Sequence, residues 1–296
     1  KYVGKRPLPF PFILGHEVSG EIAEVGPGVE GLRPGTKVGM ESIIGCGTCY
    51  HCLRGNHNLC PQWHHIGLTM DGGFAEYIKV PASLVIPLPE GAPLDSVAML
   101  EPLSLAVHTM HRVSPRPAQP VAIVGPGPIG LLHLQVIKAT GAGPILVLGR
   151  PEDAHRLQVA ADLGADRVEA VNSIEEAVAI AREMTAGVGM EIVIEATGVP
   201  AGVQTAFEIV TGNGQLVTLG LTRFTELDIL QVIRKNLTWH GVVASVRRHF
   251  LEALRLITAG RVDPSRLITH RLPLEQGVDA IRLMKERASL KVAIVP

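Results

Sequence analysis

The stretch Val121-Ala-Ile-Val-Gly-Pro-Gly-Pro-Ile-Gly130 decides the fold of this chain. It joins a short apolar strand to a helical run, residues 131–140, through a Gly-x-Gly-x-x-Gly turn. In a dinucleotide-binding turn of this kind, Gly125 permits the tight turn, Gly127 lets a pyrophosphate approach the backbone, and Gly130 brings helix and strand together. The chain has 32 glycines, so chance matches are expected and an ordinary strand–helix turn is the alternative. The strand before the turn and the helix after it favour a dinucleotide site.

The start of this helix supports the same interpretation. Pro128 falls near the first helical turn, where a missing N–H costs nothing because that group has no partner within the helix. The unpaired backbone amides of the first turn attract phosphate groups, and the helix dipole adds to this attraction.

The residues after the second strand, 145–148, bear on the choice of cofactor. NAD-selective sites usually have Asp or Glu here to bind the ribose 2′-hydroxyl, whereas an arginine accommodates a 2′-phosphate. This chain has Gly149 followed by Arg150, which favours NADP or the use of both NADP and NAD. Two alternatives stay open: Glu152 or Asp153 contacts the ribose, or Arg150 is a solvated loop residue.

Strand and helix patterns alternate beyond this point. Helices are expected over residues 154–163 and from a cap at Asn172 or Ser173 to about residue 185. Buried strands are expected at residues 191–195 and 215–219. Alternating units of this length predict an α/β domain with a doubly wound parallel sheet, over residues 103–243.

The flanking regions differ from this domain. Residues 1–102 are β-rich, with strands expected at 18–25 and 72–80 and a Pro-Gly turn that leads into a strand within 32–38. Short strands between Gly/Pro turns suggest a small barrel or sandwich. Residues 244–296 contain two expected helices, 250–259 and 275–286, and a final strand at 291–295.

All four cysteines lie within fifteen positions, spaced C-x2-C-x2-C-x7-C. We refer to residues 45–61 as the cysteine lobe. Two disulfides are the alternative, but neighbouring C-x2-C pairs would form cramped bridges that crosslink little chain. The spacing favours a tetrahedral metal site, with zinc ahead of iron, in which four thiolates leave no position open for a substrate. A structural zinc is therefore predicted at Cys46, Cys49, Cys52 and Cys60.

Composition excludes several classes of function. The 296 residues carry a formal net charge of −1, so the basic face typical of nucleic-acid or membrane-surface binding is not expected. No apolar run approaches the 18 or more residues of a membrane span. Reduced cysteines favour the cytoplasm.

Several motifs together carry a resemblance that covers essentially the whole chain. With them, the sequence resembles the zinc-containing medium-chain dehydrogenases, the group of alcohol, polyol, sugar and threonine dehydrogenases. Besides the cysteine lobe and the glycine-rich turn, the motifs are Gly15-His16-Glu17, Asp71-Gly-Gly-Phe-Ala-Glu-Tyr77, Glu101-Pro102, Glu195-Ala-Thr-Gly198, Gly212-Asn-Gly214 to Gly220, and Leu267-Ile-Thr-His-Arg-Leu-Pro-Leu274.

The resemblance implies a GroES-like β-barrel catalytic domain, completed by the C-terminal residues, and a Rossmann domain inserted between its parts. His16 would be a ligand of a catalytic zinc, and Glu17 and Glu101 would compete for the acidic position. Hydride would pass between a secondary alcohol, polyol or sugar and NADP or NAD. We expect a homodimer or homotetramer. Further cofactor contacts would come from Ile129, Thr197, Leu219 and Gly220.

One departure from the family bears on the metal site. Family members have an upstream segment with a cysteine ligand and a Ser/Thr that relays the proton, and this sequence, which begins at Lys1, contains neither. We expect it to be part of a longer chain. Two alternative functions stay open: a zinc-free enone or quinone reductase of the same fold, and a non-catalytic dinucleotide-binding protein with only the structural zinc.

Overall fold

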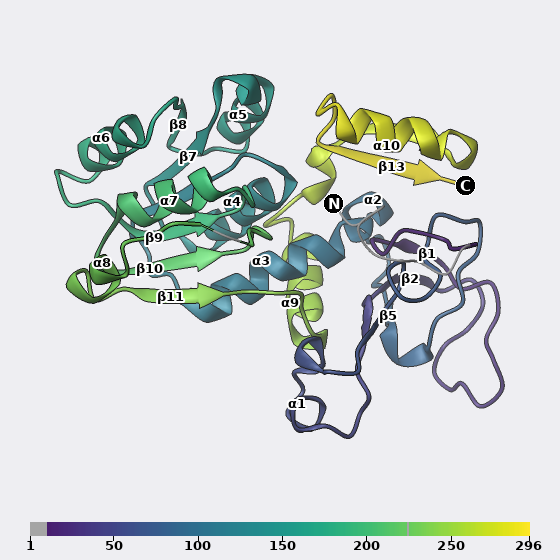
Figure 1. Ribbon diagram of the computed structural model, residues 1–296. Coiled ribbons are helices and arrows are strands. Elements are labelled where there is room, and N and C mark those ends of the chain that lie inside the picture. The colour runs from purple at the N-terminus through teal and green to yellow at the C-terminus, as the bar shows by residue number, and fades with distance from the viewer. Residues whose placement is uncertain (1–10, 224) are drawn as a thin grey trace. The chain divides into compact units, whose positions relative to one another are not determined.

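The computed structural model describes residues 11–223 and 225–296 (Figure 1). The chain forms two compact units. Residues 105–243 form one, and residues up to Ser104 together with Ala244–Pro296 form the other. We refer to them as the nucleotide unit and the outer unit.

The nucleotide unit is built on six strands: β6 (Val121–Val124), β7 (Ile145–Gly149), β8 (Arg167–Ala170), β9 (Met190–Glu195), β10 (Val210–Thr218) and β11 (Thr238–Gly241). They form one parallel sheet in the order β11-β10-β9-β6-β7-β8. The chain order reverses beside β6, because β7 and β8 follow on one side and β9 to β11 on the other. The predicted doubly wound sheet is therefore confirmed. Open α/β sheets bind ligands at such a reversal.

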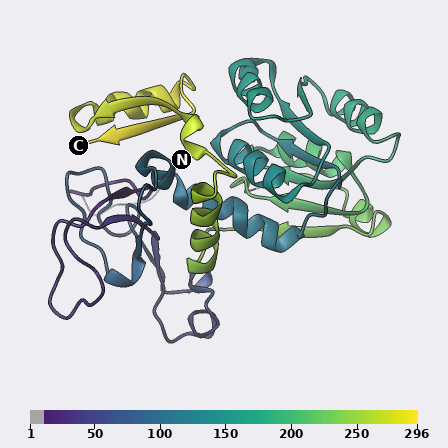
Figure 2. The ribbon, with the colours of Figure 1, turned by 180° about the vertical axis from the view of Figure 1, so that it is seen from behind.

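Helices cover both faces of this sheet (Figures 1 and 2). They are α3 (Leu100–Val113), which begins in the outer unit, α4 (Pro128–Thr140), α5 (Ala154–Asp162), α6 (Ile174–Met184), α7 (Pro200–Ile209) and α8 (Ile229–Arg234). A Cβ atom on Gly130 would lie 3.1 Å from Ile123 Cγ2, so α4 packs on the face to which Ile123 points. Ala122 and Val124 point the other way, into the buried core formed with α6 and α7.

Within the described residues, the outer unit contains three small sheets. The antiparallel sheet β1-β2-β5 and the antiparallel pair β3-β4 come from the first hundred residues, and the parallel pair β12-β13 comes from the C-terminal segment. The strands are β1 (Ser19–Glu21), β2 (Lys37–Met40), β3 (Ile43–Ile44), β4 (His64–His65), β5 (Val85–Pro87), β12 (Ile268–Pro273) and β13 (Lys291–Val295). The helices are α1 (Tyr50–Leu53), α2 (Leu94–Ala98), α9 (Arg247–Thr258) and α10 (Gly277–Lys285).

The strand expected at residues 72–80 is wrong. Gly73 N donates a hydrogen bond to Gly15 O (2.9 Å) and Phe74 N to Leu14 O (2.9 Å), so this stretch pairs irregularly with residues 13–15 and forms no regular strand. The strand expected at residues 18–25 is shorter than predicted, because regular pairing with β2 ends at Glu21.

Among residues 11–223 and 225–296, no helix combines the length and the apolar composition needed to cross a bilayer.

Candidate functional site

Three side chains that are far apart in the sequence meet in the outer unit. The ligand atoms of His16, His65 and Glu101 all lie within 4.8 Å of one another. His16 lies in the loop before β1, His65 in β4 and Glu101 in the first turn of α3. We refer to these residues as the histidine–glutamate cluster. Imidazole nitrogens and carboxylate oxygens are ordinary zinc ligands, so the donor set fits this ion.

The loop that carries His16 is held by glycines. Gly15 has φ +97°, a conformation that favours glycine, and a Cβ atom there would lie 2.6 Å from the Phe74 ring. Cβ atoms on Gly67 or Gly72 would overlap the carbonyl of Gly15. The backbone before His16 is therefore packed against other backbone with no room for side chains.

The surroundings shift the pKa of each member of this cluster. Burial, followed by the negative charge of Glu17, raises the pKa of Glu101 to about 7. Burial lowers the pKa of His65 to about 4 and also lowers that of His16. Ser42 Oγ donates a 3.4 Å hydrogen bond to Glu101 Oε1. At neutral pH both imidazoles are therefore uncharged, as metal binding requires.

Glu17, the other candidate acid, is not part of this cluster. Its Oε2 atom forms an ion pair with Lys291 Nζ, from β13. The structure thus brings together His16 and Glu101 of the three predicted residues and pairs Glu17 with a lysine.

His65 was missed in the sequence. It belongs to none of the motifs that carried the resemblance, and it enters the cluster because β4 pairs with β3 in the register Ile43↔His65. The only local signal is the His64-His65 pair a few residues after the last cysteine.

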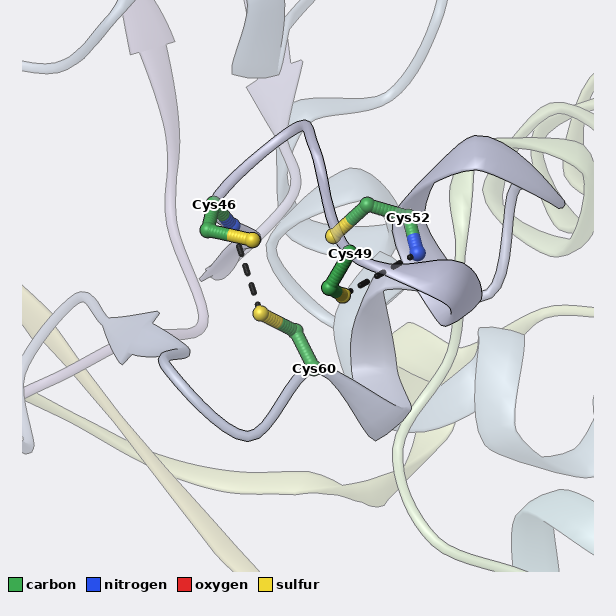
Figure 3. Close-up of side chains that lie close together, drawn as sticks. All are labelled: Cys46, Cys49, Cys52 and Cys60. Carbon is green, nitrogen blue, oxygen red and sulfur yellow. Dashed lines mark hydrogen bonds between the residues drawn. The ribbon is translucent and has the colours of Figure 1, made fainter.

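The cysteine lobe forms a second cluster. The four sulfur atoms lie within 4.8 Å of one another and none is in a disulfide. Figure 3 shows the thiols converging, with Cys46 N donating to Cys60 Sγ (3.3 Å) and Cys52 N to Cys49 Sγ (3.5 Å). Hydrogen bonds lower the pKa of Cys46 to about 6, and the largest effect comes from the backbone N–H of Thr48. Four converging thiols fit a closed zinc site, and the structure shows neither disulfide of the alternative.

Two features besides the four thiols hold the lobe. A Cβ atom on Gly45 would lie 2.5 Å from Cys52 Sγ, so only glycine fits there. From the start of α9, Arg248 donates to Gly55 O (3.4 Å) and Asn56 Oδ1 (3.1 Å).

A buried ion pair lies beside these contacts. Arg247 Nε lies 2.6 Å from Oε1 of Glu41, whose side chain is 3% exposed, and His57 Nε2 lies 3.3 Å from its Oε2. The lobe and α9 thus meet at one buried carboxylate.

The glycine-rich turn of the nucleotide unit has the expected form. Gly125 has φ +108°, and a Cβ atom there would lie 2.8 Å from Thr197 Cγ2. A Cβ atom on Gly127, the residue before α4, would meet nothing within 4 Å, so a ligand has room to approach the backbone. Pro128 and Ile129 begin α4, whose free amides face the same turn.

A buried carboxylate organises the neighbouring loops at this edge of the sheet. Glu195, which is fully buried, accepts hydrogen bonds from Thr197 N (2.7 Å) and Gly198 N (2.8 Å) through Oε1, and from Gly220 N (3.2 Å) through Oε2. Leu219 N donates to Glu195 O (3.0 Å). The expected cofactor residues Thr197, Leu219 and Gly220 therefore meet at one residue, whose organising role the sequence did not reveal.

Gly149 and Arg150 lie at the end of β7. A Cβ atom on Gly149 would lie 2.9 Å from Pro126 Cγ and 3.1 Å from Leu157 Cδ2, so an acidic side chain has no space there. The Arg150 side chain is 57% exposed, and its contacts within the described part of the chain are long: to Asn172 O (3.4 Å) and Glu152 (3.9 Å). It is therefore free to turn toward a ligand.

Comparison with known proteins agrees with this description. The family model "Alcohol dehydrogenase GroES-like domain" matches residues 1–90, and the model "Zinc-binding dehydrogenase" matches residues 128–259. L-threonine 3-dehydrogenase of Pyrococcus abyssi is 36% identical over 293 residues, which cover 96% of this chain and 82% of that protein. Sorbitol dehydrogenase of Bacillus subtilis is 31% identical over 299 residues, which cover 99% of this chain and 84% of that protein.

Solved structures agree as well. Galactitol-1-phosphate dehydrogenase from Escherichia coli superposes with a TM-score of 0.88 at 31% identity, over 97% of this chain and 85% of that one. The expected GroES-like and Rossmann architecture is thereby confirmed. The chain belongs to the zinc-containing medium-chain dehydrogenase family and is an oxidoreductase with zinc and a nicotinamide dinucleotide as its cofactors.

Proposed function

We propose that this protein transfers a hydride between the carbinol carbon of a secondary alcohol, polyol or sugar and NADP or NAD, with a catalytic zinc at His16 and Glu101. The observation that carries the proposal is the histidine–glutamate cluster, in which donor atoms from three separate segments lie within 4.8 Å of one another. A zinc ion held there supplies Lewis-acid polarisation of the substrate oxygen.

The roles of the two carboxylates follow from their contacts. Among the described residues, Glu101 forms no ion pair, and the side-chain hydrogen bond that it accepts, from Ser42, is long at 3.4 Å, so its oxygens are available to a cation. Glu17 is paired with Lys291, which leaves it turned to a cation other than the metal. We therefore assign ligation to Glu101 and an electrostatic role to Glu17, whose charge opposes the ionisation of Glu101.

The substrate class rests on the relatives. L-threonine 3-dehydrogenase and sorbitol dehydrogenase are named for substrates with a secondary hydroxyl group, and D-arabitol-phosphate dehydrogenase of Enterococcus avium is 32% identical over 289 residues. Oxidation of a secondary carbinol to a ketone is the chemistry that these names share. We propose the same chemistry here, with a polyol or sugar alcohol as the substrate.

For the cofactor we propose a preference for NADP. Gly149 leaves no space for an acid against the ribose, and Arg150 carries an exposed guanidinium one residue further on. Gly125, Gly127 and Gly130 would admit the pyrophosphate to the start of α4. Arg150→Ala should lower the ratio of kcat/KM for NADP to that for NAD about 10-fold or more, because a charge-assisted contact to the 2′-phosphate is lost. An unchanged ratio would contradict the preference.

The cysteine lobe would hold a structural zinc through Cys46, Cys49, Cys52 and Cys60, and this ion would take no part in the chemistry. Four unpaired thiols support a reducing compartment, so we propose the cytoplasm.

We also propose a homo-oligomer. Strand β11 is an edge strand of the parallel sheet, and unpaired edges tend to be covered. Helix α8 exposes apolar side chains in the same unit: Ile229 (60% exposed), Leu230 (46%) and Ile233 (72%). A homodimer or homotetramer would bury such surface, and light scattering on purified protein measures which of these forms exists.

The function is tested by assaying the purified protein with NADP and NAD over a panel of polyols, sugars, secondary alcohols and threonine, together with its zinc content. Two zinc ions per chain and hydride transfer to at least one carbinol are expected. Reduction of enones without zinc would favour the zinc-free reductase, and one zinc without any hydride transfer would favour the non-catalytic alternative.

A further inference from the structure

We propose that His65 is a third protein ligand of the metal held by His16 and Glu101. The inference rests on the proposed function for the presence of that metal, and it adds a ligand that neither the sequence motifs nor the comparisons assign. The position, the tautomer and the support of the His65 ring all suit it to bind a metal ion.

The position of His65 separates it from its neighbour in the chain. His64 and His65 are consecutive residues of β4, so their side chains point to opposite faces of the strand. His64 is exposed, whereas His65 is 7% exposed and its ring stands edge-on to that of His16, with centroids 4.8 Å apart. The buried face of β4 thus carries its imidazole into the histidine–glutamate cluster.

The hydrogen bond of the ring determines which nitrogen is available. His65 Nδ1 lies 2.7 Å from the carbonyl oxygen of Ile66, which can only accept, so Nδ1 carries the proton and Nε2 carries the lone pair. A backbone carbonyl bound to one ring nitrogen is the usual second-shell arrangement of a metal-binding histidine. Among the described residues, none donates a hydrogen bond to His65 Nε2. If His65 had only a structural role, the lone pair of Nε2 would have no partner.

The ring is also supported firmly enough to act as a ligand. His65 N donates to Thr69 Oγ1 (2.8 Å), and Ile66 N donates to Ser42 O (2.9 Å). Ile66 is fully buried. The same Ser42, which lies between β2 and β3, donates its hydroxyl hydrogen to Glu101, so one residue supports both His65 and Glu101.

The separations leave room for an ion. A tetrahedral zinc with ligands at about 2.0–2.1 Å holds them roughly 3.4 Å apart. The donor atoms in the structure lie up to 4.8 Å apart. Small side-chain rotations would bring them to the separation that a bound zinc requires.

The test compares His65→Ala with His64→Ala, a matched change of the exposed neighbour on the same strand. Each full-length variant is saturated with zinc and dialysed, its zinc is counted by mass spectrometry, and its zinc affinity is measured by chelator competition. The zinc of the cysteine lobe serves as an internal control for folding, and Co²⁺ substitution reports the coordination of the other ion through its visible spectrum.

We expect His64→Ala to keep two zinc ions and His65→Ala to keep one, with affinity at the histidine–glutamate cluster lowered more than about 100-fold. This exceeds the roughly 10–100-fold effect of losing a residue that only supports a ligand. A His65→Ala protein that keeps two zinc ions and an unaltered Co²⁺ spectrum would overturn the inference. Metal counts do not depend on turnover. A wild-type protein that binds two metal ions but oxidises no carbinol would therefore contradict the proposed function without contradicting the assignment of His65 as a ligand.

Discussion

The cysteine lobe and the histidine–glutamate cluster are two candidate metal sites assembled in opposite ways. The lobe takes all its donors from fifteen consecutive residues, Cys46 to Cys60. The other cluster takes His16, His65 and Glu101 from segments up to 85 positions apart (101 − 16) and aligns them through a glycine-packed loop, a two-residue strand and a helix start. We expect a local site to need its ion in order to fold, whereas a dispersed site forms only after the surrounding fold has brought its residues together.

The largest effect should come from breaking the local site. Cys60→Ser replaces a thiol that is 1% exposed, and we expect loss of one zinc and of more than about 4 kcal/mol of unfolding free energy, because the lobe has little apolar core of its own. Zinc content and chemical denaturation measure both losses. A variant of unchanged stability would show that the lobe folds without its ion.

Breaking the dispersed site should remove activity while leaving the fold intact. Glu101→Gln keeps the shape of the side chain but removes the anionic ligand, so we expect kcat/KM to fall at least 100-fold, with the denaturation midpoint changed little. Glu90→Gln, a change of an exposed glutamate in the same unit, is the matched control. Equal kinetics for the two variants would remove Glu101 from the reaction.

The dispersed site should also respond to pH near neutrality. The pKa of Glu101 is raised to about 7, so this carboxyl binds more protons in the folded apo-protein than in the unfolded chain between about pH 4.5 and 7, and its own contribution to stability falls as the pH rises through this range. The lowered pKa of His65 acts in the opposite direction. Zinc requires the ionised carboxylate, so affinity at this cluster should rise about 10-fold per pH unit below 7 and then level off. Chelator competition between pH 5.5 and 8 measures this, and a flat profile would contradict it.

The smallest effect should come from loosening the attachment of the lobe. Arg248→Ala removes side-chain contacts to Gly55 and Asn56 but none to a thiol, so we expect both zinc ions to be kept and a loss of about 1 kcal/mol or less. Thermal unfolding and zinc content test this. Loss of the lobe zinc would show that this site, too, depends on distant segments.

The contrast explains what the sequence could predict. The spacing of the cysteines and the turn from Gly125 to Gly130 are local patterns. They predicted the converging thiols and the tight strand–helix turn that the structure shows. Ser173 was one of two predicted caps for α6, and its Oγ accepts a hydrogen bond from Glu176 N (3.2 Å). Signals of this kind lie within a few residues of what they determine.

Features that depend on packing were missed or misjudged. Residues 72–80 alternate like a strand, yet Gly72 and Gly73 fit against the backbone of residues 13–15 and regular pairing is lost. Helix α3 runs across the predicted boundary between residues 102 and 103, because proline is tolerated in the first turn of a helix. His65 owes its importance to strand register, and Glu195 connects the amides of its own loop to that of Gly220 in another loop; neither long-range relation is encoded by a local pattern.

The glycine packing around His16 has a consequence for mutational tolerance. Gly15, Gly67 and Gly72 bear no functional group, but a single added methyl group at any of them would push the His16 loop away from its neighbours. In a saturation library selected for turnover, these three positions should therefore be as intolerant of substitution as the ligands themselves. A map of essential positions alone would therefore not distinguish glycines that are required for packing from residues that bind the metal.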